Sequence, residues 1–178
     1  QSNYLIDASA KAWTLPVGPA IMFDELIVKG VVTLHDADLS QVSARLYGGT
    51  ANGKVTVSWQ KGILFKGNLD INQMEMQKIA SIMLPSKNHI SGKLRAKPIL
   101  FASAASADQL MNALRLETPF NVQSGVIHGV DIQKVATGLI KPDSTGGETH
   151  FEHLSGYLVM AHRDYHFTQL QISSGSFT

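Results

Sequence analysis

Cysteine is absent from the 178-residue chain. This excludes disulfides, thiolate zinc sites and thiol nucleophiles together. The sequence also lacks a run of about eighteen apolar residues, the length that a membrane-spanning helix requires, and it shows no secretory signal pattern at its start. What it does contain is 44% hydrophobic residues, enough for one domain with a substantial core.

Charge of either sign is not in excess. Fifteen basic residues stand against fourteen acidic ones, which gives a formal net charge of +1. A nucleic-acid partner would require a clustered basic face, so none is expected. Lys93, Arg95 and Lys97 do share one face of a predicted strand. A solvated outer face explains them, and contact with a lipid headgroup or a protein partner is the alternative.

Alternation of apolar and polar residues predicts most of the structure. The clearest case places Val55, Val57 and Trp59 on one face of a strand that follows the hairpin signal Asn52-Gly53. Similar patterns predict strands over residues 26–34, 42–47, 63–71 and 90–100, and a final hairpin of residues 148–160 and 165–173 with its turn at 162–164. Strands that are apolar on one side favour a long, curved, largely antiparallel sheet, and hence a mainly β (α+β) fold. No βαβ rhythm is sustained, so a doubly wound parallel sheet is not expected.

About three short helices are expected between these strands. The first has an apolar stripe over residues 76–84, with a capping box at Asn72 and Glu75 and an end at Pro85. The second follows Ser106 as its cap and carries four apolar residues: Leu110, Met111, Ala113 and Leu114. No change in composition marks a boundary, so residues 1–178 are predicted to form a single domain.

The third helix belongs to the central unit, residues 118–139. Phe120 and Val122 share one face of a strand, Ser124-Gly125 breaks that strand, and Asp131 caps an amphipathic helix over residues 131–139. Because its carboxylate suits free backbone N–H groups, Asp131 is interpreted as a cap and not as a catalyst.

A near-match to a phosphate-binding loop lies at residues 48–55, GGTANGKV. It satisfies G-x-x-x-x-G-K but places Val55 where the magnesium-binding hydroxyl should be. It also leads into a strand, whereas a phosphate cradle needs a helix N-terminus. We interpret it as a glycine-rich hairpin loop, and no nucleotide or other cofactor is expected.

Histidines suggest a metal hypothesis for the final hairpin, which contains His150, His153, His162 and His166. Residues three apart on a strand point to opposite faces, so His150 and His153 cannot share an ion unless the strand bulges. Surface histidines are the preferred interpretation, and no metal ligand is assigned. The sequence contains no G-x-S-x-G motif, and its acidic residues are scattered through predicted turns, caps and strand ends. No catalytic residue is assigned, and an enzymatic activity stays only as a residual hypothesis.

Four segments together resemble the AsmA-like family of Gram-negative envelope proteins. They are residues 46–53 (LYGGTANG), 90–94 (ISGKL), 120–132 (F-x-V-x-x-G-x-I-x-G-V-D-I) and 149–156 (T-x-F-x-x-L-x-G). The resemblance extends from about Leu26 to the end of the chain. The closing hairpin departs from the expected pattern, because Arg163-Asp164 stands where a tighter Asn-Gly or Asp-Gly turn would be usual.

The resemblance implies that this chain is a fragment of the C-terminal region of a longer periplasmic protein, tethered to the inner membrane by a helix outside the fragment. It also implies a role in outer-membrane biogenesis. Larger relatives, the TamB-like proteins, are thought to carry phospholipid across the periplasm in a long β-groove. Phospholipid acyl chains are therefore the expected partner, with envelope proteins as further candidates.

Two non-enzymatic hypotheses follow. In the first, the apolar side of the curved sheet is an open groove that contacts acyl chains during lipid transport or homeostasis. In the second, residues 76–84 and the other helices fill that side completely, and the domain is a structural or interaction module for outer-membrane protein assembly that binds partners at its sheet edges. Whether the groove stays open discriminates between them. The face that carries Val55, Val57, Trp59, Ile63 and Phe65 points inward by periodicity, but no individual lipid-contact residue is assigned.

Overall fold

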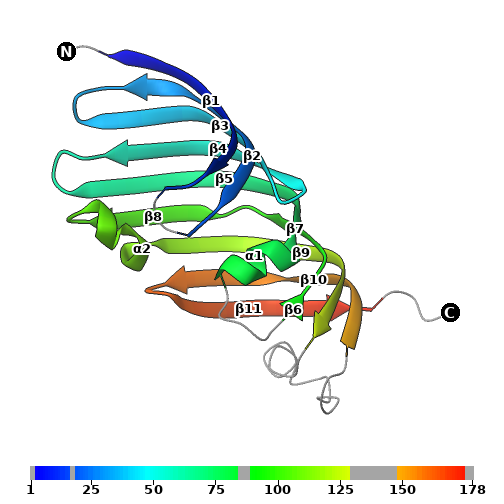
Figure 1. The fold of residues 1–178 in the computed structure, drawn as a ribbon. Coiled ribbons are helices and arrows are strands. Elements are labelled where there is room, and N and C mark those ends of the chain that lie inside the picture. The colour runs from blue at the N-terminus through cyan, green and yellow to red at the C-terminus, as the bar shows by residue number, and fades with distance from the viewer. Residues whose placement is uncertain (1–2, 17–18, 84–88, 129–147, 175–178) are drawn as a thin grey trace.

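The computed structural model describes residues 3–16, 19–83, 89–128 and 148–174. These residues form one antiparallel sheet of eleven strands, which confirms the mainly β prediction (Figure 1). The strands are β1 (Tyr4–Thr14), β2 (Met22–Val32), β3 (Asp36–Leu46), β4 (Gly49–Ser58), β5 (Ile63–Glu75), β6 (His89–Ile90), β7 (Lys93–Ala96), β8 (Ile99–Ala104), β9 (Arg115–His128), β10 (Glu148–Ala161) and β11 (Asp164–Ser173). The helices are α1 (Met76–Met83), the 3₁₀ turn η1 (Ala107–Gln109) and α2 (Leu110–Ala113).

The sheet is a meander in which most sequential strands are neighbours. Its order is β1-β2-β3-β4-β5-β7-β9-β10-β11, while β8 pairs with β5 and β9, and β6 pairs with β9. Short turns join β2 to β3, β3 to β4 and β4 to β5, and each of these strands pairs with the next. Strands β1 and β11 form the two edges.

The predicted strand over residues 90–100 is three strands in the structure. β7 and β8 lie between β5 and β9, and the chain is interrupted between them at Lys97-Pro98. Proline cannot donate to a ladder, so it separates two strands more readily than it continues one. Leu94 and Leu100 nevertheless share one face of the sheet, since they lie opposite Val122 and Leu116 of β9.

The prediction of a hairpin turn at Asn52-Gly53 is wrong. The chain reverses at Tyr47-Gly48, where both residues have positive φ (50° and 77°), and Leu46 pairs directly with Gly49. Asn52 and Gly53 lie inside β4, opposite Asp70 and Leu69 of β5. A two-residue turn with positive φ at both positions matches the twist of the flanking strands, which explains its use here.

The predicted capping box at Asn72 is also wrong. Asn72 pairs with Thr50, and β5 continues through Glu75 after a bulge at Gln73, whose φ is 57°. α1 therefore begins at Met76, whose N–H donates to the Gly92 carbonyl oxygen 2.9 Å away. The residues that were predicted to cap the helix, Asn72 and Glu75, belong to β5 instead.

The second helix lies where it was predicted, with Ser106 as the N-cap of η1. The Ser106 hydroxyl, however, donates to the Asp108 carboxylate and makes no bond to the backbone. The third predicted helix, with its cap Asp131, lies outside the described residues, as does Pro85 at the predicted end of the first.

Strand β9 is continuous through the predicted break at Ser124-Gly125. Ser124 has a positive φ of 54°, and Val122 and Ile127 are both fully buried although they are five residues apart. Since residues an odd number apart normally face opposite sides, the alternation changes phase at Ser124. The strand curls instead of ending, and the far ends of β9 and β10 bend together in Figure 1.

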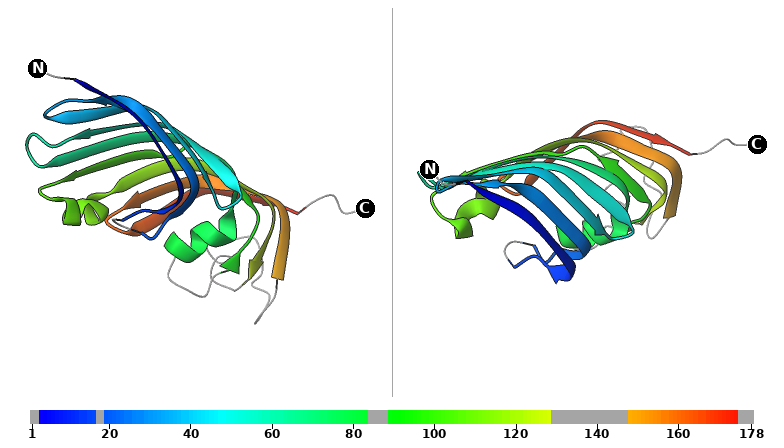
Figure 2. Two further views of the ribbon diagram at one scale, coloured as in Figure 1. Left: turned by 45° about the horizontal axis from the view of Figure 1, so that its top comes forward. Right: turned by 90° about the horizontal axis from the view of Figure 1, so that it is seen from above.

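The core lies under this curl, on the concave side of the sheet where α1 packs (Figure 2). Ala80 of α1 joins a cluster that includes Met74, Leu94, Phe151 and Leu154, and this cluster reaches Ala44, Leu46 and Ala51 of β3 and β4. α1 thus covers one end of the concave side. α2 lies at the opposite end of the strands, after β8 (Figure 1).

Candidate functional site: the concave apolar face

One side of β1–β5 is lined with aliphatic side chains. Direct cross-strand partners share a face, so the pairs Val28–Val42, Leu39–Val55 and Val57–Phe65 place these residues on one continuous surface. We call this surface the apolar face. Its members on the five strands are Tyr4, Ile6, Ala8, Ala10, Leu26, Val28, Val32, Ala37, Leu39, Val42, Val55, Val57, Ile63, Phe65 and Leu69.

Burial divides the concave side into two parts. Near α1, Ala44, Leu46 and Ala51 are fully buried. Away from α1, the members of the apolar face on β2–β5 stay partly exposed, Val55 and Val57 among them. α1 therefore packs over one end of the concave side, while the members of the apolar face further along β2–β5 stay accessible.

The accessible part of the apolar face extends both along and across the strands. Six residues separate Ala51 from Val57, which corresponds to about 20 Å along the strand at 3.3 Å per residue. Five strands at a spacing of about 4.8 Å make the face roughly 19 Å wide.

The opposite side of the same strands is polar. Lys54 and Thr56 alternate with the apolar members of β4, and Lys66, Asn68 and Asp70 do so on β5, all of them exposed. Ion pairs on this side are long and solvated, such as Arg45–Glu25 at 3.6 Å. The sheet is therefore strongly one-sided, as the alternation predicted.

The basic residues of β7 also lie on the polar side. Arg95 and Lys97 are exposed and line a broad depression of about 630 Å³, together with Asp70 and several amide side chains. Lys93 forms a 3.8 Å ion pair with Glu75. This arrangement agrees with a solvated outer face, which was the preferred interpretation of the three residues.

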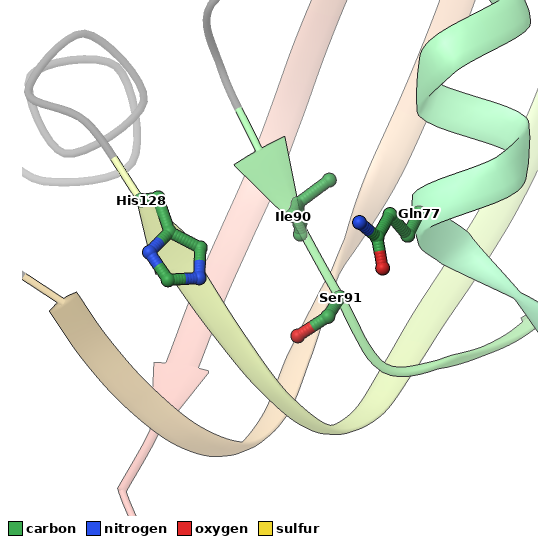
Figure 3. Close-up of a pocket in the computed structure, with 4 residues that line it drawn as sticks. All are labelled: Gln77, Ile90, Ser91 and His128. Atoms are coloured by element: carbon green, nitrogen blue, oxygen red, sulfur yellow. The ribbon is translucent and has the colours of Figure 1, made fainter.

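A smaller pocket of about 360 Å³ lies beside α1, lined by Gln77, Ile90, Ser91 and His128 (Figure 3). The Ser91 hydroxyl accepts a hydrogen bond from the Val126 N–H at 3.2 Å, and His128 Nδ1 lies 3.5 Å from the Glu148 carboxylate. Serine catalysis requires a hydrogen bond between the hydroxyl and the imidazole. In the described structure the Ser91 hydroxyl is hydrogen-bonded to the backbone of β9 and not to the His128 imidazole.

The histidines of the final hairpin do not converge. His150 Nε2 lies 3.4 Å from a Glu148 oxygen, whereas His153 Nδ1 lies 3.4 Å from the Asn121 side-chain oxygen. His162 occupies the β10–β11 turn, as predicted, with a φ of 51°. Within the described ranges, no group of three or more metal-ligating side chains could hold an ion.

The glycine-rich segment 48–55 is part of the sheet. It forms the β3–β4 turn and most of β4, and Gly53 and Val55 pair with Leu69 and Gly67 of β5. A phosphate cradle needs several free N–H groups at a helix N-terminus. No such geometry exists at this segment: Gly48 forms the turn, and Gly49 and Gly53 allow close approach of the neighbouring strand.

Sequence reasoning missed two features of the site. It did not identify the edge strand β1, whose Ile6, Ala8 and Ala10 extend the apolar face. It also gave no role to Leu34, which is 76% exposed beside Trp59 at one end of that face. The signal for β1 was weak because small residues replace the larger aliphatic ones that mark a strand.

Comparisons of the chain with protein-family models, with curated proteins and with solved structures find no match. The resemblance to AsmA-like proteins therefore stays a prediction. None of the helices in the described part of the chain has the length and apolarity to cross a bilayer. The fold and the site define a one-sided, curved antiparallel sheet with a partly uncovered apolar face.

Proposed function

We propose that this chain is a non-enzymatic, lipid-handling module of an AsmA-like envelope protein. Its apolar face contacts phospholipid acyl chains during lipid transport or homeostasis in outer-membrane biogenesis. The module works in the periplasm, as part of a protein tethered to the inner membrane. The motif pattern supports the family and the compartment, and the one-sided sheet supports the lipid contact.

The observation that carries the proposal is the division of the concave side. At the end near α1, Ala44 and Ala51 are buried in the core cluster that includes Ala80 of α1, while Val55 and Val57 further along β4 stay partly exposed. Leaving so much aliphatic surface in water is unfavourable by about 25 cal/mol per Å². An acyl chain seated there would gain about 0.8 kcal/mol for each buried CH₂ group. Such contacts are non-directional, so they require no polar or catalytic constellation.

The alternative is an interaction module that assists or regulates outer-membrane protein assembly through its sheet edges. The observation in its favour is β1, an edge strand of eleven residues without proline that pairs only with β2 among the described strands. Exposed edges of this kind add a partner strand readily. This alternative does not explain the partly exposed apolar face.

Native mass spectrometry tests the proposal directly. The chain is purified from a bacterial periplasm without detergent, and Val57→Asp is compared with Thr56→Asp. Val57 is on the apolar face and Thr56 is its exposed neighbour on the polar side. We expect phospholipid-mass adducts on the wild type and on Thr56→Asp, and their loss from Val57→Asp. Both variants are checked for folding by circular dichroism.

Two outcomes would count against lipid contact. A wild type that carries no adduct would favour the interaction module. Equal adducts on both folded variants would show that lipid binds elsewhere on the chain.

A further inference from the structure

The apolar face ends in three exposed side chains at the end of the sheet away from α1. Tyr4 pairs with Val32, and Leu34 follows Val32 by two residues. Trp59 lies next to this turn, because its backbone N–H donates to the His35 carbonyl oxygen at 2.9 Å. Tyr4, Leu34 and Trp59 are 65%, 76% and 42% exposed. We call these three residues the lip. In Figure 1 this is the end where β1 begins and where the β2–β3 and β4–β5 turns lie.

The lip is continuous with the apolar face. Tyr4 and Val32 are cross-strand partners on that face, and Val57 precedes Trp59 by two residues on the same strand pattern. The other end of the concave side is covered by α1. Under the proposed function the apolar face is the floor of a lipid trough. Among the described elements, α1 covers the end of that face away from the lip, and α2 lies at the lip's end, after β8.

The Trp59 side chain can be transferred from water to an apolar medium without losing a hydrogen bond. Its indole N–H donates to the Leu34 carbonyl oxygen at 2.8 Å, so the polar atom of the ring already has a partner inside the protein. A tryptophan with a satisfied N–H can enter an apolar medium without leaving an unpaired donor. The same bond holds the ring against the backbone of the β2–β3 turn, in which Leu34 lies.

Charge does not direct the lip to a particular partner. The turns of residues 33–36 and 59–62 contain one acid, Asp36, and one base, Lys61, which cancel. Thr33 donates to the Asp36 carboxylate at 2.8 Å, and this bond holds the first turn. Binding by such a surface depends on apolar contact and not on attraction to anionic groups.

We propose that the lip inserts into the surface of a phospholipid bilayer, so that acyl chains pass between the bilayer and the apolar face. This rests on the proposed function, because lipid reaches the trough at the lip. A bilayer suits two exposed apolar turns better than a protein partner, since insertion requires neither a concave partner nor matched charges. Aromatic and aliphatic side chains are also the residues that anchor proteins at the membrane interface.

Vesicle co-sedimentation tests the lip, with phosphatidylcholine vesicles and Leu34→Asp compared with Leu5→Asp. Leu5 is 87% exposed at the same end of β1, but it pairs with Val31 on the other side of the sheet. The wild type and Leu5→Asp should bind, and Leu34→Asp should bind at least about tenfold more weakly, as expected for a carboxylate in place of an inserted leucine. Binding should persist in high salt, which screens charges but not apolar contacts. Equal binding by the two variants, or loss of binding in salt, would overturn the proposal.

A second measurement separates the lip from the trough. A short-chain phosphatidylcholine, kept monomeric in solution, should bind Leu34→Asp and the wild type equally, because monomers need no docking. If the wild type binds vesicles through Leu34 but takes up no monomer, the lip stands and the proposed lipid trough fails. If sedimentation velocity shows a wild-type dimer that Leu34→Asp dissociates, the lip is an interface between copies and the bilayer proposal is wrong.

Discussion

Gly53 of β4 lies so close to Asn68 of β5 that a Cβ built on the glycine would stand 1.8 Å from the Asn68 carbonyl oxygen. The two residues belong to neighbouring strands in the uncovered half of the sheet. Glycine is required there because the backbone of the partner strand occupies the space of a side chain, and not because the chain turns.

Gly53→Ala should therefore destabilise the protein by about 3 kcal/mol, the upper end of the range for overpacking. Gly67→Ala is the matched control. It pairs with Val55 on the same face, but a Cβ there would make ordinary contacts, 3.4 Å from the ends of the Leu100 and Val55 side chains and 3.6 Å from the Lys54 carbonyl oxygen. Chemical denaturation of both variants measures the difference. Equal losses of stability would contradict the close approach at Gly53.

The β10–β11 turn offers a stabilising substitution. His162 and Arg163 have φ angles of 51° and 64°, a conformation that side chains with a Cβ adopt at a cost of about 1 kcal/mol. The backbone is a two-residue hairpin turn, so the unusual turn residues flagged from the sequence did not change the turn geometry.

Arg163→Gly should raise the free energy of unfolding by up to about 1 kcal/mol, less the extra flexibility that glycine gives the unfolded chain. At 2–4 °C per kcal/mol for a chain of this size, the melting temperature should rise by roughly 2 °C. Asp164→Gly is the control, since Asp164 begins β11 and has no positive φ. Thermal unfolding of the two variants should change in opposite directions. A fall in melting temperature for Arg163→Gly would contradict the explanation that the positive φ at Arg163 is unfavourable.

The strands were predictable because a strand has a period of two that leaves a direct mark on the sequence. That alternation correctly placed Val55 and Val57 on one face and Lys54 and Thr56 on the other. A curved sheet followed from several such strands in succession. The apolar face could therefore be predicted in outline.

The turns and caps were less predictable, because local signals compete with pairing across the sheet. Asn52-Gly53 and Asn72 carry strong local signals, yet their backbone groups pair between β4 and β5. Ser124-Gly125 has the composition of a strand break, but β9 continues through it. The positive φ of Ser124 changes the direction of the strand at this point. The extent of coverage by α1 depends on packing between distant segments, such as those that bring Ala80 and Ala44 into one buried cluster, which no local pattern encodes.

The phenol of Tyr157 titrates abnormally on the polar side. Burial raises its pKa above the ordinary value of about 10, and the Glu117 carboxylate adds to the shift by its charge and by accepting the phenol hydrogen bond at 3.3 Å. All three causes favour the protonated form. Because the folded pKa is raised, the associated stability is present below pH 10 and is lost as the pH rises through the folded value.

Glu117→Gln should lower the pKa of Tyr157 toward its ordinary value, since it removes the charge and leaves the burial. Absorbance titration of phenolate, taken as the difference from a Tyr157→Phe variant, isolates this residue from the other three tyrosines. Glu152→Gln is the control, because Glu152 lies on the same strand as Tyr157 and is not among the causes of its shift. An unchanged pKa in Glu117→Gln would leave burial as the sole cause.

The two alanines of β3 on the concave side test whether that side is open. Ala37 pairs with Val57 and is partly exposed, whereas Ala44 pairs with Ala51 and is only 5% exposed in the cluster that includes Ala80. Ala44→Leu should cost about 1–3 kcal/mol because a larger side chain must displace its neighbours. Ala37→Leu should change stability by less than about 0.5 kcal/mol, since it adds apolar volume to free space.

Chemical denaturation compares the two variants, and similar large losses of stability at both positions would mean that the whole concave side is packed. In that event the interaction module would be the better proposal, because an apolar face without free space cannot seat an acyl chain.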